Sequence, residues 1–436
     1  MNPAAAPAAP RVFLFLQGPS SSLFYKIAAL LEAAGHTCLR VNLNVGDWLF
    51  WPRRGGVNYR GRLSEWPAYI ERLLTSRYVT DLVLLGEERP YHRIAVDLAK
   101  AKDIAVTVIE MGYLRPDWIT VERDGMSSNS RFPNDPERIL SAAASLAMPS
   151  MEPVYKQSFF VEALLDLSYN LPNVFLAPLF PGYRRHALFH PLKEYAGWII
   201  RLLKSSRNRK KAALIIDVLY SSGQPFFVYP LQLETDYQLR SHSPYHHQAE
   251  AIEEILRSFA QHSSPDIVLV VKLHPLDNGL IDWQRDIKNL ADSMGLKERV
   301  YVVDGGDLNV LTRRCRGMVT VNSTAVLPGV CLGVPVKVLG CAIYDVRGIT
   351  HQGQLDTFWR TPEKPDSELT DSFLRLMARA IHVRGNFYSR FGTNTGAKAI
   401  AQKLLLNCVN APGADCGFAP RAKPKKRTSC GNEISA

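Results

Sequence analysis

The sequence predicts an α/β protein of two Rossmann-like lobes with a cleft between them. Short β-branched apolar runs alternate with amphipathic stretches, which is typical of parallel sheets covered by helices. This alternation occurs twice, on either side of a basic segment near residue 210. The chain of 436 residues, 46% hydrophobic and 21% charged, also has the length and composition of a globular protein with two domains.

The first half begins with a buried strand at residues 11–16 (RVFLFL). The QGPSSS segment, residues 17–22, leads into a helix with apolar residues at helical spacing, which ends near Gly35. A second strand is expected at residues 38–44. The same cadence of strand, helix and strand continues through residues 81–86, 92–100 and 104–110.

The second half opens with a strand at residues 226–232, a helix at about 247–261 and a strongly β-branched strand at 266–275. The alternation continues through residues 299–304, 317–322, 325–333 and 334–340. Ligands of open α/β sheets bind beyond the carboxyl ends of the strands, so the loops that follow each strand are where site residues are expected.

These patterns divide the chain into five predicted parts. They are a disordered N-terminus (1–10), a first lobe (11–200), a basic linker or membrane-surface segment (201–211), a second lobe (212–405) and a basic disordered tail (410–436).

The formal net charge of +11 comes from 52 lysines and arginines against 41 acidic residues. Residues 201–211 hold six basic residues and no acid, and residues 420–436 hold five basic residues and one acid. The rest of the chain is nearly neutral, which argues against a protein that coats nucleic acid. The first segment adjoins the apolar run at 196–203, so we expect an interfacial helix on an anionic membrane; a solvated interdomain helix is the alternative.

Seven cysteines without a CxxC pair indicate neither a disulfide framework nor a zinc site and suit a reducing compartment. The N-terminus lacks the pattern of a signal peptide, and no stretch reaches the roughly 20 apolar residues that span a bilayer. We therefore expect a cytoplasmic protein, peripheral to a membrane. No metal is expected, because Asp304 and Asp307 are too isolated to form a site.

Three loops offer anion-binding groups. Lys272 and His274 of the KLHP segment lie on one side of an extended chain and could hold a phosphate, or could be a solvated lysine and a capping histidine. The VNSTA segment offers hydroxyls and helix amides, although simple N-capping also explains it. In QGP, Gly18 permits close backbone approach and Gln17 offers a neutral donor and acceptor, but a tight turn needs no ligand.

Carboxylates follow strand ends in both halves: Glu87, Glu88, Glu110, Asp117 and Asp236. Transfer of a sugar needs a carboxylate as base or nucleophile, which makes this set a source of candidates. Surface carboxylates are common, and for each of these residues a structural role is the alternative.

Six segments together resemble the bacterial capsule polysaccharide biosynthesis proteins that transfer β-linked Kdo, an eight-carbon relative of sialic acid. These segments are FLQGP (15–19), VNLNVGDWLFWP (41–52), RPYHR (89–93), EMGYLRPDWIT (110–120), KLHP (272–275) and VNSTA (321–325). The similarity runs from about residue 11 to 405, and the chain length matches the single-module member that acts on lysophosphatidylglycerol. The resemblance implies a GT-B-like, retaining glycosyltransferase that needs no cofactor and uses CMP-β-Kdo as donor.

The resemblance also implies roles for residues. The donor would contact Lys272, His274 and Pro275, then Asn322, Ser323 and Thr324, and also Gln17, Gly18 and Arg115. Arg115 or Arg89 would pair with the donor's carboxylate as a bidentate fork. The acceptor would contact Arg89, His92, Trp48 and Asp117.

For catalysis, Asp236 lies four residues after Gln232, as an aspartate does in relatives, and would be the nucleophile. Glu110 would be the general base or the second choice, and His274 would stabilise the leaving cytidylate. Met111 stands where relatives often carry an acid, which leaves that position without a role.

The implied partners are CMP-Kdo, lysophosphatidylglycerol or phosphatidylglycerol, an anionic inner-membrane surface, and the two-module transferase with the capsule export complex. Two other functions stay open: a different CMP- or nucleotide-sugar transferase, such as a sialyltransferase, and a nucleic-acid-binding or scaffold protein. The nearly neutral body and the absence of a nucleic-acid module disfavour the last of these.

Overall fold

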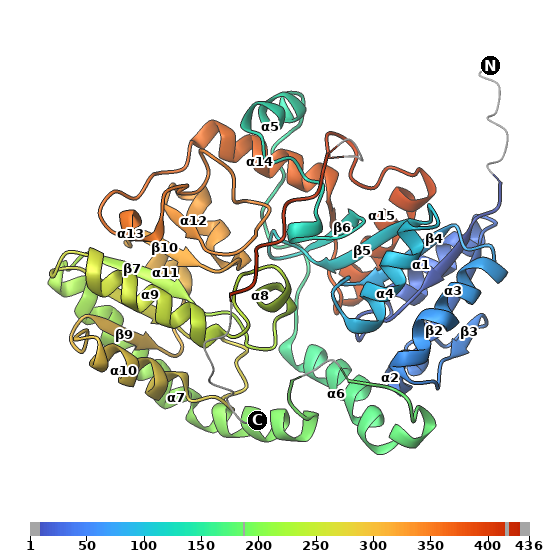
Figure 1. Cartoon of the computed structure of the whole chain (residues 1–436), viewed down its shortest axis with the longest axis horizontal. Coiled ribbons are helices and arrows are strands. Elements are labelled where there is room, and N and C mark those ends of the chain that lie inside the picture. Colours follow the sequence, from blue (N-terminus) through green and yellow to red (C-terminus); the bar gives the residue numbers. More distant parts are fainter. Residues whose placement is uncertain (1–8, 186–187, 415–417, 428–436) are drawn as a thin grey trace.

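The computed structural model describes residues 9–185, 188–414 and 418–427. It contains two sheets with helices packed around them, one in each half of the molecule (Figure 1). The predicted class, an α/β protein of GT-B-like type with two Rossmann-like lobes, is confirmed.

The first lobe is built on a seven-stranded sheet in the order β12-β6-β5-β4-β1-β2-β3. Its strands are β1 (Val12–Phe15), β2 (Thr37–Asn42), β3 (Gly56–Asn58), β4 (Asp81–Leu85), β5 (Ala105–Met111), β6 (Trp118–Arg123) and β12 (His382–Arg384). The five strands from β3 to β5 are parallel, and β6 runs antiparallel to both of its neighbours.

The second lobe has a five-stranded parallel sheet in the order β11-β10-β7-β8-β9. Its strands are β7 (Phe226–Pro230), β8 (Val268–Lys272), β9 (Val300–Val303), β10 (Gly317–Thr320) and β11 (Val336–Val338). Counted within each lobe, both parallel cores have the strand order 3-2-1-4-5. The order reverses next to β1 in one lobe and β7 in the other, which is where such sheets bind ligands.

Helices cover both sheets. Those from the first half of the chain are α1 (Leu23–Ala33), α2 (Val45–Leu49), α3 (Trp66–Ser76), α4 (Pro90–Lys100), α5 (Pro136–Ala143), α6 (Phe159–Phe175) and α7 (Pro191–Ser222). Those from the second half are α8 (Tyr237–Ser241), α9 (Gln248–His262), α10 (Trp283–Ser293), α11 (Leu308–Thr312), α12 (Leu327–Cys331), α13 (Leu355–Phe358), α14 (Ser367–Ala380) and α15 (Arg390–Leu405).

The central strands are apolar along their whole length because helices bury both of their faces. Every residue of β4, β7 and β8 is buried, and one continuous apolar cluster runs from the first lobe into the second. Where α5 meets α14, the rings of Phe132 and Phe373 are 5.3 Å apart. The lobes therefore share part of one core.

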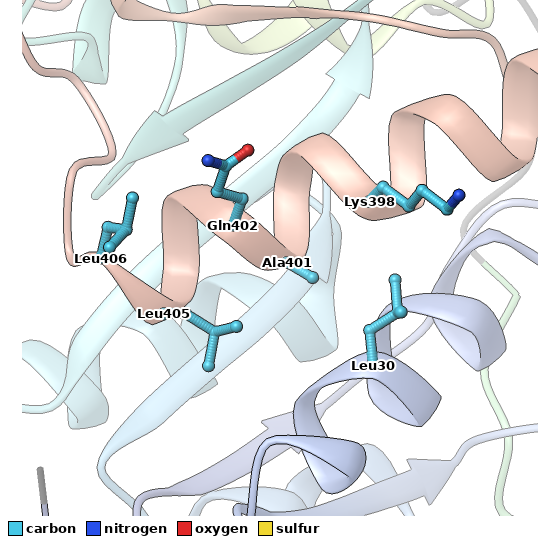
Figure 2. Close-up of a pocket in the computed structure, with 6 residues that line it drawn as sticks. All are labelled: Leu30, Lys398, Ala401, Gln402, Leu405 and Leu406. Carbon is cyan, nitrogen blue, oxygen red and sulfur yellow. The ribbon is translucent and has the colours of Figure 1, made fainter. Parts of the chain in front are cut away.

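The chain returns to the first lobe at its end, which corrects the predicted second lobe of 212–405. Strand β12 pairs with β6 of the first sheet, and α15 packs against α1. Figure 2 shows Leu30 of α1 beside Ala401 of α15, at a small surface groove of about 280 Å³. The apolar side chains of α15 pack with those of α1 and β1 in one cluster of the first lobe. The hydropathy of a helix does not indicate which lobe it covers, so the sequence could not predict this return.

The predicted linker at 201–211 is the middle of α7, a helix of 32 residues. Arg201 binds within the second lobe, whereas the side chains of Lys204, Arg207, Lys210 and Lys211 are exposed. Among the described residues no helix is long and apolar enough to cross a bilayer.

Much of the predicted disordered tail lies against the body, which corrects that prediction for residues 410–414 and 418–427. Asn410 and Ala414 are fully buried, and Asn410 accepts from the Arg123 amide of β6. Arg421 donates to the carbonyls of Phe132 and Pro133 in the first half of the chain, and to Ile343 of the second lobe. Figure 1 shows this segment running between the two lobes. Residues 1–8 and 428–436 of the predicted disordered ends lie outside the described residues.

Candidate functional site

The loop after β1 carries Gln17 and positions Arg89. The guanidinium of Arg89 donates to Gln17 Oε1 over 2.9 Å, and Gln17 Nε2 donates to the hydroxyl of Tyr169 on α6 over 2.6 Å. Both ends of the Gln17 amide are thus engaged within the chain. Gly18 has a packing role, because a Cβ there would lie 2.7 Å from the Phe24 ring.

A buried network behind this loop was not predicted. The Tyr169 hydroxyl donates to Asp47 over 3.0 Å and also accepts from Asn44, and Asp47 forms a 3.0 Å ion pair with Arg40. Burial raises the pKa of Asp47, and Arg40 works against that rise. Tyr169 comes from a helix far along the sequence, so no local pattern links it to Asp47.

Glu110 lies at the end of β5, half-buried, with one oxygen accepting from the Met111 amide over 3.0 Å. Burial raises its pKa, and the charges of Arg89 and Arg115 oppose that rise. The charge of Asp236, from the second lobe, raises it further. The two predicted catalytic carboxylates therefore lie within electrostatic reach of each other across the lobes.

Asp236 caps the short helix α8, where its Oδ1 accepts from the Gln238 amide over 2.8 Å. Gln232, after β7, lies 3.5 Å from Asp236 Oδ2 and exchanges hydrogen bonds with Asn322, after β10. Burial raises the pKa of Asp236, whereas the Gln238 amide, Gln232 and Arg115 lower it. Asn322 has its polar atoms engaged within the chain, so it positions this loop.

Lys272 and His274 follow β8. The Nδ1 atom of His274 accepts from the Leu276 amide over 3.0 Å, so the proton of the neutral ring is on Nε2. Burial lowers the pKa of His274 to about 4, helped by Arg115 and Arg201. Burial also lowers the pKa of Lys272. His274 is thus a neutral donor at physiological pH, and Pro275 is exposed beside it.

Ser323 is a helix cap, as the alternative interpretation of VNSTA anticipated. Its hydroxyl accepts from the Ala325 amide over 3.2 Å, at the start of a single 3₁₀ turn that runs into α12. Thr324 is the half-buried first residue of that turn. In this loop the Thr324 hydroxyl stays a candidate for a ligand contact.

The residues expected to bind the acceptor differ in their exposure to solvent. Trp48 on α2 is 48% exposed and available. His92 is fully buried, and its Nδ1 lies 2.7 Å from the Gly86 carbonyl, so it supports the loop after β4. Asp117 is buried and accepts from the amides of Val154 and Tyr155 and from Asn386, so it joins two loops. Within the chain His92 and Asp117 position loops, and the acceptor contacts expected of them stay predictions.

A second interlobe cluster was also missed. Glu87 and Glu88, after β4, lie with His242 of the second lobe so that their ligand atoms are within 4.8 Å of one another. Lys423 of the tail donates to Glu88 over 2.6 Å, and Ser128 lies 2.6 Å from His242 Nδ1. Burial lowers the pKa of His242 to about 4. The tail thus supplies a cation to these carboxylates.

Arg115 connects the two sides of the main site. Its charge acts on the pKa of Glu110 in its own lobe and of Asp236 and His274 in the other. The ends of β4, β5, β7 and β8 and the loops after them therefore bring two carboxylates, guanidinium groups and a neutral imidazole together, at the ligand-binding edge of both sheets. Such a set can stabilise a leaving phosphate and move a proton.

Several known proteins resemble this chain over most of its length. Residues 80–388 match the family model described as capsule polysaccharide biosynthesis protein. The capsule polysaccharide modification protein LipB of Neisseria meningitidis serogroup A is 33% identical over 392 residues, covering 86% of this chain and 91% of that protein. The capsule polysaccharide export protein KpsS of Escherichia coli is 32% identical over 378 residues, covering 86% and 96%.

A more distant likeness is to a solved structure, the β-Kdo 2,7 transferase KpsC of Thermosulfurimonas dismutans. It has a TM-score of 0.45 and 14% identity, with 91% of this chain and 99% of that chain covered. The family match spans residues 80–388, which include the last strands of the first lobe, the whole second sheet and the carboxylates Glu110 and Asp236. By this match and by its LipB and KpsS relatives, the chain belongs to the capsule polysaccharide biosynthesis family.

Proposed function

We propose that this protein is a retaining glycosyltransferase of capsule synthesis, which transfers Kdo from CMP-β-Kdo to lysophosphatidylglycerol or phosphatidylglycerol. The observation that carries the proposal is the placement of Arg115 within electrostatic reach of Glu110, Asp236 and His274. A sugar bearing its own carboxylate, joined to a phosphate, needs cations and a nucleophile in one place. The family membership supports the capsule pathway.

In the first step the Asp236 carboxylate forms a bond to the anomeric carbon. The bond from that carbon to the phosphate oxygen breaks, and its electron pair leaves with CMP. Lys272 ends β8 and His274 follows it, and there the Nε2–H of His274 and the ammonium of Lys272 stabilise the charge that develops on the phosphate. Arg115, and Arg89 held by Gln17, supply forks for the carboxylate of the sugar.

In the second step the acceptor hydroxyl attacks the same carbon, and the bond to Asp236 breaks to restore the carboxylate. The hydroxyl proton goes to Glu110, whose pKa is raised by burial toward the range that suits a general base. Two successive inversions at one carbon give overall retention.

The proposal includes contact with an anionic membrane surface through α6 and α7. Phe160 and Leu164 of α6 and Ile199 and Leu203 of α7 are exposed. The Phe159 and Trp198 rings are 6.5 Å apart, which places the two helices together. Exposed apolar side chains next to the cations of α7 are typical of interfacial helices.

The test compares Asp236→Asn with the control Asp307→Asn in assays of transfer from CMP-Kdo to lysophosphatidylglycerol, followed by mass spectrometry. Both aspartates cap short helices of the second lobe through the same kind of amide contact, and asparagine keeps that contact. We expect Asp236→Asn to lose activity by at least about a thousandfold while Asp307→Asn retains it.

Near-normal turnover by Asp236→Asn would remove the nucleophile from the mechanism. CMP-sialic acid is assayed beside CMP-Kdo as an alternative donor. Faster use of CMP-sialic acid would contradict the proposed donor and leave the transferase chemistry standing.

A further inference from the structure

A cavity of about 920 Å³ lies in the first lobe, away from the groups assigned to the donor. Its walls come from the start of α1, the segment 154–158 that leads into α6, and the start of α15. Figure 1 shows α1 and α15 side by side in this lobe, with α6 beyond them. A volume of this size is in the range of sites for small organic ligands.

Basic side chains form part of the cavity lining. Lys26 of α1, Lys156 and Arg390 of α15 line it, and none of the three forms an ion pair in the described parts of the chain. Lys26 and Arg390 line the same cavity, and burial together with the charge of Arg390 lowers the pKa of Lys26. A bound anion would relieve this repulsion.

Hydroxyl groups also line the cavity. Ser22, Ser389 and Tyr388 line the cavity. Burial raises the pKa of Tyr388 to about 12, and the charges of Glu162, Asp166 and Glu110 add to the rise. The cavity therefore comes within electrostatic reach of Glu110, the proposed general base.

Apolar side chains form another part of the lining. Val161 and Leu165, one helical turn apart on α6, line it together with Phe50. The same helix exposes Phe160 and Leu164 to the outside. An apolar chain lying against α6 could therefore pass from the cavity to the exposed surface of that helix.

Asp117 holds both walls. Its carboxylate accepts from the amides of Val154 and Tyr155 on one side and from Asn386 on the other. Burial tends to raise the pKa of Asp117, but these hydrogen bonds outweigh it and keep the pKa below its usual value. The ionised Asp117 thus fixes both segments of the cavity wall and contacts no ligand itself.

We infer that this cavity binds the acceptor as an anionic single-chain amphiphile. The phosphate would lie between Lys26 and Arg390, the acyl chain against Val161 and Leu165, and the reacting hydroxyl toward Glu110. As the acceptor subsite of the transfer reaction the inference rests on the proposed function, but the binding itself needs neither donor nor turnover.

The test measures binding to the full-length protein without CMP-Kdo. The probes are a short-chain lysophosphatidylglycerol below its micelle concentration, the neutral monoacylglycerol of equal chain length, and inorganic phosphate. The proteins are wild type, the double variant Lys26→Gln/Arg390→Gln, and the control Lys398→Gln. Lys398 and Arg390 both belong to α15. Figure 2 shows Lys398 at the separate groove that Leu30 also lines.

We expect the double variant to lose at least about tenfold in affinity for lysophosphatidylglycerol, since the charge-assisted contacts to the phosphate are removed. The control and the affinity for monoacylglycerol should not change. Equal affinity of wild type and double variant for lysophosphatidylglycerol would overturn the inference, as would phosphate binding as tightly as the lipid, because the chain would then contribute nothing.

A second measurement separates this inference from the proposed function. In transfer assays the double variant should raise the KM for the acceptor and leave the affinity for CMP unchanged. If wild type binds the lipid in this charge-dependent way but transfers no Kdo, the subsite stands and the proposed reaction fails. If transfer proceeds and the acceptor KM is the same in both proteins, the subsite fails and the reaction stands.

Discussion

Two basic segments of similar composition, residues 201–211 in α7 and 421–427 in the tail, have different places in the structure. In α7 one cation, Arg201, is bound within the fold, and the side chains of Lys204 and Lys210 extend into solvent. In the tail, Arg421, Lys423, Lys426 and Arg427 all contact the body.

The difference follows from what each backbone allows. A helix places its side chains all around its axis, so the face of α7 toward the second lobe holds Arg201 while the other faces stay solvated. The tail is extended and lies in contact with the body, where backbone carbonyls and carboxylates are within reach. Two segments with similar numbers of basic residues, six in α7 and five in the tail, therefore behave differently. In α7 one arginine is bound and a group of cations stays solvated, whereas most of the tail cations bind the body and Arg421 joins the two lobes.

The largest expected effect comes from Arg201→Ala. The guanidinium lies 3.1 Å from Asp277 and 2.5 Å from Asp304 and donates to the His274 carbonyl, with all three ionic groups mostly buried. Its loss leaves two carboxylates unpaired, so we expect the free energy of unfolding to fall by about 3 kcal/mol in denaturant titrations. Lys204→Ala is the control and should leave stability unchanged; an equal loss in both variants would contradict the comparison.

A smaller effect is expected at the Lys423 contact. The pKa of His242 is about 4 in the folded protein against 6.5 for a free histidine. The unfolded chain binds more protons between these values, so stability is complete above pH 6.5 and is lost as the pH falls toward 4. Lys423 helps to lower this pKa.

Between pH 6.5 and 4, the melting temperature of Lys423→Ala should therefore fall by less than that of wild type. At neutral pH the substitution should lower the free energy of unfolding by less than about 1 kcal/mol, because the lysine is half-exposed. Lys425→Ala, which alters an exposed neighbour in the tail, is the control. If the acid-induced loss is as steep in Lys423→Ala as in wild type, the tail does not influence His242.

The smallest effect on stability should come from changing the exposed cations of α7 to glutamine. Replacing Lys204, Arg207, Lys210 and Lys211 together should change the free energy of unfolding by no more than about 0.5 kcal/mol, because their side chains are solvated. Sedimentation with phosphatidylglycerol vesicles should show a loss of about 1 kcal/mol for each cation that reaches the surface. Unchanged sedimentation would contradict membrane contact through α7.

Hydrophobic patterning predicted the strands that form the centre of each sheet. The runs at residues 11–16, 81–86 and 266–275 contain β1, β4 and β8, because strands buried on both faces must be continuously apolar. Shorter strands at the sheet edges, such as β3 and β12, carry no such pattern and were missed. The membership of β12 and α15 in the first lobe depends on contacts made across more than 250 residues.

In the candidate site, too, some features were predicted from local sequence and others depend on long-range contacts. Carboxylates and cations were expected after the strands, and Glu110, Arg115, Asp236 and His274 lie where that rule places them. The roles of His92 and Asp117 could not be predicted, because a buried histidine and a ligand-facing one have the same local sequence. Tyr169 and Lys423 join the site only through packing between distant segments.

The sequence by itself determined the α/β class, the two halves, the position of the site at the strand ends and the family. Each of these depends on local periodicity, on turn residues or on segments that match as strings. The tertiary structure alone decided which cations are bound and which are free, which acids face the other lobe, and where an apolar wall meets Lys26 and Arg390. Those features depend on distances between residues far apart in the chain, and a distance through space is set by packing.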